Sequence, residues 1–106
     1  MNDVQFVEAA RAIAQRAIEL HRNNFDSQLD YLTERLITRK FEANERDIAK
    51  ASYKDFLRHY DTRPDDARKL IAVGESKANS KLPTPEFAAL TMLANELMNL
   101  DEVLNK

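Results

Sequence analysis

The strongest constraint on this fold is one apolar stripe near the C-terminal end of the sequence. Thr84 is suited to cap a helix, and Pro85 suits the first helical position, where the N–H that proline lacks is not needed. Apolar residues then recur at three- and four-residue steps: Phe87, Leu90, Leu93 (or Ala94), Leu97 and Leu100. This spacing predicts one amphipathic helix that ends near Leu100, with Leu104 folding back as a short tail. A stripe of this width needs other helices to cover it.

The composition favours a single all-α domain. The 106 residues are enough for one domain with a hydrophobic core and too few for two. With 43% hydrophobic and 32% charged residues, the sequence is typical of a soluble, folded protein. One glycine and three prolines supply too few turns for a β-rich domain of this length. Residues 1–106 are therefore interpreted as one helical domain.

Charge and cysteine content exclude several kinds of site. The net charge is −2, and the basic residues along 33–69 are interleaved with nearly as many acidic ones, so no basic footprint for nucleic acid is expected. Because there is no cysteine, disulfides, zinc–thiolate sites, iron–sulfur clusters and covalently attached haem are excluded from this segment. No apolar run is long enough to span a membrane. The sequence begins without a signal peptide and directly inside a helical pattern, which suggests an excised C-terminal fragment of a larger protein.

Two helices are expected in the first 40 residues. The first spans Val4 to His21 and stops at Asn23-Asn24; the alanines on its apolar side would let a neighbouring helix approach closely. The second spans Ser27 to Thr38, with Ser27 and Asp30 as a capping pair.

Two more helices are expected before the C-terminal one. The third spans Asn44 to Tyr60, is capped by Asn44 and carries Ile48 on its apolar stripe. The short fourth helix is capped by Thr62, ends near Val73 and is followed by Gly74 as a left-handed stop. We expect a bundle of about five helices, one of them short, in which the first and last pack together at the centre and the second and third complete it.

Gly74, Glu75 and Ser76 form the first candidate for chemistry. A nucleophile needs a base within reach and an oxyanion donor, and Gly-Glu-Ser lacks the Gly-x-Ser-x-Gly pattern of a nucleophile elbow. The simpler interpretation is a glycine at positive φ, followed by side chains that bond exposed backbone. We therefore keep these three residues as interaction candidates.

Asn95, Asn99 and Asp101 form a second, polar candidate cluster at the end of the last helix. Asn95 and Asn99 are four residues apart and share a helix face. A calcium loop would need more acids at alternating positions and a glycine, so we expect these side chains to bond neighbouring backbone. His21 and His59 have no ligand-like neighbours in sequence and are expected to be structural or solvated.

Four stretches, taken in order, resemble one known family. Asn2 to Ala12 resembles an "N-D-P-x-F-V-E-A-A-R-A" signature, and Tyr31 to Arg39, with Arg35-Leu36-Ile37-Thr38, resembles a helix of the form "R-L-A-T-G-R". Gly74 to Ser76 resembles a "G-E-S" loop, and Glu86 to Leu104 resembles "E-L-A-A-W-T-L-V-A-N-x-L-L-N-L-D-E". Together they are similar to the C-terminal part of a planctomycete-specific domain of unknown function, found in large exported proteins with planctomycete cytochrome C-like domains.

This sequence departs from the family pattern at three places. Val4 stands where the family usually has proline, Arg39-Lys40 where it has Gly-Arg, and Thr91-Met92 where it has tryptophan-threonine. These differences weaken helix caps and change one core contact but leave the helical plan intact.

The resemblance implies an exported or periplasmic bacterial parent, with any haem held elsewhere in that parent and no cofactor or metal in this segment. We therefore expect a non-catalytic structural or interaction module that packs against upstream domains of its own chain, with no catalytic residue of its own. The alternative is that this segment contributes part of a ligand-binding or active site shared with upstream domains of a redox or polysaccharide-degrading parent. Self-association also stays open, because Tyr31, Tyr53 and Met92 do not all fit inward-facing positions.

Overall fold

The computed structural model describes the backbone of residues 4–73, 77–79 and 81–104, and the side chains of 7–73, 77–79 and 81–100. Five helices account for most of these residues, and no strand occurs in the described ranges. The helices are α1 (Val4–Leu20), α2 (Phe25–Leu36), α3 (Ala43–Thr62), α4 (Pro64–Ile71) and α5 (Thr84–Leu104). The prediction of an all-α bundle with one short helix is confirmed.

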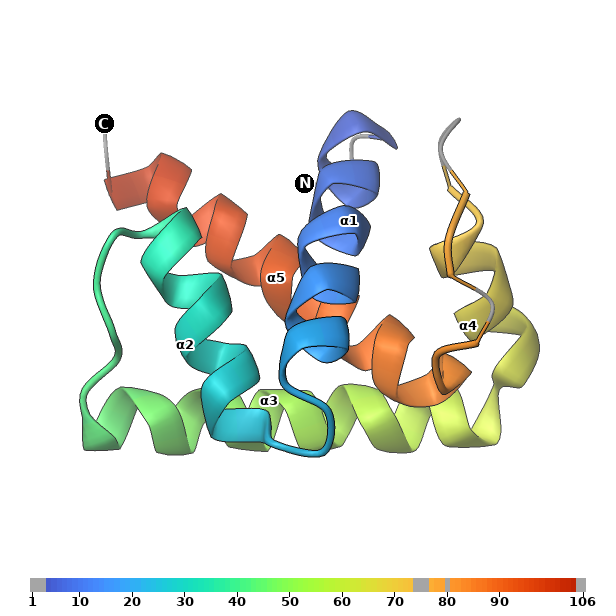
Figure 1. Ribbon diagram of the computed structural model, residues 1–106, viewed down its shortest axis with the longest axis horizontal. Coiled ribbons are helices and arrows are strands. Elements are labelled where there is room, and N and C mark those ends of the chain that lie inside the picture. Colours follow the sequence, from blue (N-terminus) through green and yellow to red (C-terminus); the bar gives the residue numbers. More distant parts are fainter. Residues whose placement is uncertain (1–3, 74–76, 80, 105–106) are drawn as a thin grey trace.

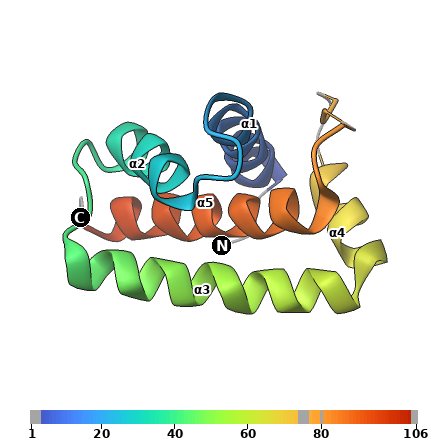
Figure 2. The same ribbon diagram turned by 60° about the horizontal axis from the view of Figure 1, so that its bottom comes forward.

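The helices form three layers with α5 in the middle. Figure 2 shows α1 and α2 side by side on one face of α5, while α3 runs antiparallel to α5 along the opposite face. The short α4 lies where α3 ends and α5 begins (Figure 1). Each of the other four helices contacts α5, and α1 and α3 do so most extensively. The first and last helices pair as predicted, but the prediction that both are central was wrong for α1, which lies with α2 in an outer layer.

The central position of α5 changes the predicted role of its apolar stripe. Five consecutive residues, Phe87–Thr91, are buried, as are Leu93, Ala94, Asn95 and Leu97. Because helices cover α5 from both sides, it is buried nearly all round over this stretch and is not a helix with one wet face. The prediction of a single buried stripe was too narrow, and it was wrong at its last member, since Leu100 is 43% exposed.

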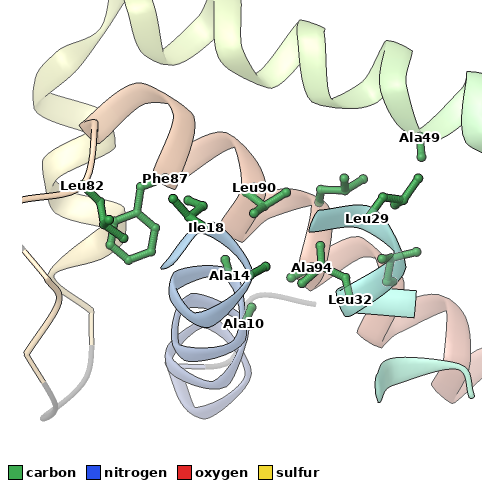
Figure 3. Close-up of a cluster of buried hydrophobic side chains, with 13 residues drawn as sticks. Ala10, Ala14, Ile18, Leu29, Leu32, Ala49, Leu82, Phe87, Leu90 and Ala94 are labelled. Atoms are coloured by element: carbon green, nitrogen blue, oxygen red, sulfur yellow. The ribbon is translucent and has the colours of Figure 1, made fainter. Parts of the chain in front are cut away.

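Small side chains let α1 lie close against α5. Ala10, Ala14 and Ala17 are completely buried, and Ile18 adjoins them (Figure 3). Alanine has no atoms beyond Cβ to hold a neighbouring backbone away, so these positions allow a short distance between helix axes. The complete burial of Ala10 and Ala14 and the extensive α1–α5 contact agree with the close approach expected from the alanines of residues 9–14.

The start of α2 is set two residues earlier than predicted. Asn24 is the N-cap, and its side-chain oxygen accepts a hydrogen bond from the backbone N–H of Ser27 at 3.1 Å. The assignment of Ser27 as the cap was therefore wrong. Asn23 has a φ of 60° and lies between α1 and α2, in agreement with the predicted stop at Asn23-Asn24. An asparagine tolerates this left-handed conformation better than most residues.

Glutamate, not asparagine, caps α3. Glu42 and Glu45 form a reciprocal capping box, in which the backbone N–H of Glu42 donates to the Glu45 side chain at 2.9 Å. The prediction of Asn44 as the cap was wrong by two residues. At the other end, Thr62 is still helical and its hydroxyl donates to the carbonyl of His59 at 3.0 Å. Thr62 is thus committed to the end of α3 and is not the cap of α4.

The ends of α4 and α5 also differ from the prediction. Arg63 is the N-cap of α4, with Pro64 in its first turn, and α4 ends at Ile71. The predicted stop at Gly74 lies outside the described residues. Thr84 is already helical, because the N–H of Phe87 donates to the carbonyl of Pro83 at 2.9 Å. The helix continues to Leu104, so the predicted fold-back of Leu104 was wrong.

Candidate functional site

A largely apolar groove lies between α3 and the C-terminal half of α5. It encloses about 360 Å³. We call it the α3–α5 groove, and its lining residues are Phe41, Glu45, Ile48, Ala49, Ser52, Leu93, Glu96, Leu97 and Leu100. Most of these side chains are apolar, as in a surface that binds another apolar group.

Apolar side chains are unusually exposed at this groove. Three large apolar residues are exposed among those with described side chains, and two of them, Ile48 (67%) and Leu100 (43%), line the groove. The third is Leu20. Spacing alone assigned both Ile48 and Leu100 to buried stripes, and that assignment was wrong. Both residues line the α3–α5 groove, which the five helices leave open.

One end of the groove is held by a bidentate ion pair. The guanidinium of Arg39 donates to both carboxylate oxygens of Glu45, at 2.8 and 2.7 Å, and its carbon lies 5.6 Å from the centre of the Phe41 ring. These bonds from Arg39, with the capping bond from the backbone of Glu42, lower the pKa of the Glu45 carboxyl to about 2. Both oxygens of Glu45 are therefore occupied by partners within the chain, and the carboxylate stays charged.

Glu96, the second carboxylate of the groove, has a different environment. It is exposed and forms no hydrogen bond or ion pair with any residue whose side chain the structure describes. Desolvation beside the apolar lining raises the pKa of its carboxyl above the ordinary value. The groove thus combines an apolar floor with two carboxylates. Glu45 is paired with Arg39, and Glu96 has no cationic partner among the described residues.

A second hollow of about 190 Å³ lies at the turn between α1 and α2. The ring of Tyr53 stacks on Phe25 with centroids 4.8 Å apart, and Glu86 and Arg22 lie at the rim. Burial, then the negative charges of Glu86 and Asp61, raise the pKa of Tyr53 to about 12. The phenol is therefore neutral at physiological pH. Such a phenol can donate a hydrogen bond but is not a ready base.

A third hollow, also at the surface, is built around Tyr31. The Arg35 guanidinium lies 3.6 Å from the centre of the Tyr31 ring, and His21 approaches the same ring edge-on at 6.3 Å. This arrangement accounts for the partial burial of Tyr31 by a cation–π contact within α2. The Nε2 atom of His59, the other histidine, lies 3.7 Å from the Oδ2 atom of Asp66.

Of the sequence-predicted site residues, two have side chains that the structure describes, Asn95 and Asn99. Asn95 is buried at 3% exposure inside the helix layers, and Asn99 is half-buried one turn later on α5. Gly74, Glu75 and Ser76, and the side chain of Asp101, lie outside the described residues.

Arg11 is a buried polar residue that the sequence analysis did not single out. It is 1% exposed and is the largest fully buried side chain described, with Glu8 as an ion-pair partner at 3.7 Å. The helical spacing of Arg11 from Val7, Ala14 and Ile18 places it on the buried face of α1. That spacing was the available signal, and the charge of Arg11 obscured it.

No protein-family model, curated protein or solved structure was found to match this chain. Within the described residues, no group of three or more His, Cys, Asp or Glu side chains is placed to hold a metal ion. None of the described helices has the length and apolar character needed to cross a membrane.

Proposed function

We propose that this chain is a non-catalytic helical module of a larger exported bacterial protein, and that it packs against other domains of that protein through the α3–α5 groove. The observation that carries the proposal is the pair of exposed apolar side chains, Ile48 and Leu100, on either side of an apolar floor. Contiguous exposed apolar surface is unfavourable in water and commonly marks a contact with another protein surface. The larger, exported parent is proposed from the family resemblance.

The structural role is further supported by how α3 is anchored beside the groove. The bidentate Arg39–Glu45 pair and the capping box at Glu42 fix the first turn of α3. Ala49 belongs to the cluster of buried residues that also contains Leu29 of α2 and Leu93 of α5. These two helices therefore hold the α3 backbone beneath the groove. A surface that is preorganised in this way loses little conformational entropy when it binds.

The substitution Ile48→Asp tests the proposal in two settings. In the 106-residue chain alone, it is expected to change the free energy of unfolding by less than about 0.5 kcal/mol, because the side chain is already mostly in water. In the longer protein, expressed with the residues encoded before Met1, the same change is expected to cost about 2 kcal/mol or more, because it buries a charge at an apolar contact. Urea unfolding followed by circular dichroism measures both values.

Asp47→Ala is the matched control, since Asp47 is exposed on α3 and does not line the groove. It is expected to have a small effect in both settings. Equal and small effects of Ile48→Asp in the short and long proteins would remove the proposed packing role of the groove.

A further inference from the structure

The two carboxylates of the α3–α5 groove differ in what neutralises them. Glu45 has a bidentate arginine within the chain, whereas Glu96 has no cation among the described residues. An acid that remains ionised beside apolar surface gains most from a cation when the surface is covered and water is excluded. The covering group is therefore expected to bring a positive charge to Glu96.

The shape of the groove favours a helix as its occupant. Its α5 wall runs from Leu93 to Leu100, which is about 10 Å along the axis at 1.5 Å per residue. Its α3 wall, formed by Glu45, Ile48, Ala49 and Ser52, lies opposite, since α3 and α5 are neighbours that run in opposite directions at an inclination to each other (Figures 1 and 2). A third helix laid between two such helices presents side chains at i, i+3 or i+4, and i+7 over this length.

Charge argues against a second copy of this chain as the occupant. A two-fold dimer through the groove would face each groove with the same surface of its partner. That contact places two copies of Glu96 and two of Glu45 in one interface, and no described lining residue is a cation, since Arg39 beside the groove is already bonded to Glu45. Like charges in a water-excluded contact are unfavourable, so a partner with the opposite charge fits better.

We propose that the α3–α5 groove binds an amphipathic helix from another domain of the same longer protein, and that a lysine or arginine beside the apolar stripe of that helix pairs with Glu96. This inference rests on the packing role proposed above and adds the chemistry of the partner. The apolar positions of the helix lie against Ile48, Leu97 and Leu100. Its cation supplies the charge that Glu96 does not receive from its own chain.

Synthetic helices test the charge requirement on the 106-residue chain itself. The probes are peptides of about 16 residues that share leucines at i, i+4 and i+7, and carry either lysine or glutamate at the positions flanking the stripe. Fluorescence anisotropy gives the Kd of each labelled peptide. The lysine peptides are expected to bind about tenfold more tightly than the glutamate peptides at low salt, and less so at high salt.

Three variants of the chain separate the possible outcomes. Glu96→Gln is expected to reduce the lysine preference to less than about threefold, while Asp47→Asn, a matched neutralisation outside the groove, leaves it unchanged. Ile48→Asp is expected to weaken all peptides at least about tenfold. If Ile48→Asp weakens binding but the lysine preference is absent or survives Glu96→Gln, the partner chemistry is wrong and the packing role stands. If no peptide binds, or binding is insensitive to Ile48→Asp, both proposals fail.

Discussion

Phe87→Ala is expected to lower the free energy of unfolding by about 3–5 kcal/mol, the largest effect of any substitution considered for this chain. Phe87 is completely buried in the first turn of α5 and lies beside Leu82 in the main core (Figure 3). Removing the ring forfeits its transfer from water and leaves a cavity that the surrounding helices cannot fully close. Urea unfolding monitored at the helical circular-dichroism band measures the loss.

Leu20→Ala serves as the control for Phe87→Ala. Leu20 is 51% exposed at the end of α1, so its truncation is expected to change stability by no more than about 0.5 kcal/mol. A loss below about 1 kcal/mol for Phe87→Ala would mean that the start of α5 is not packed in the core as described.

The second large effect is expected from adding volume where α1 and α5 meet. Ala14→Leu places a side chain with three more carbons at a completely buried position on α1 (Figure 3). Close packing leaves no space for them, so α1 must shift away from α5, at an expected cost of about 2–3 kcal/mol. The same urea titration measures the change.

Ala12→Leu is the matched control, because Ala12 is on the same helix but exposed. Leucine and alanine both favour helices, so this variant is expected to be close to the parent in stability. Similar losses at positions 12 and 14 would contradict a close α1–α5 contact made by alanines.

The sequence allowed the five helices to be predicted, because apolar residues at three- and four-residue spacing leave few alternatives when glycine and proline are scarce. The helix starts were harder to predict. Asn24 and Ser27 are both good caps, and only the tertiary position of α2 decides that Asn24 accepts the bond. Likewise, Glu42 caps α3 because its backbone N–H donates to the Glu45 side chain, to which Arg39 from the preceding loop also donates.

The groove could not have been predicted from the sequence. Ile48 has the spacing of a buried residue but is 67% exposed. The α3 and α5 ribbons are inclined to each other and separate toward the C-terminal end of α5 (Figure 1). The angle between two helices depends on the side chains of both, which a one-dimensional pattern does not contain. For the same reason, the burial of α5 on nearly all sides was not apparent from a stripe of five apolar positions.

The candidate site differs from the polar clusters that the sequence suggested. Polar residues such as Asn95 were singled out because polar groups at a helix end can bind a ligand, yet Asn95 is buried between helix layers. The apolar residues Ile48 and Leu100 received no functional interpretation, since an apolar residue is normally assigned to the core. Exposure, and not residue type, is what makes them candidates for binding.

The helices close a core around α5 while leaving an apolar groove beside α3. The most direct measurement is the relaxation of methyl NMR signals of the isolated chain by a soluble paramagnetic agent, which broadens only methyls that solvent reaches. Strong broadening is expected for Ile48 and Leu100, and none for Leu90 or Leu29, which are completely buried. Protection of Ile48 equal to that of Leu90 would contradict this arrangement.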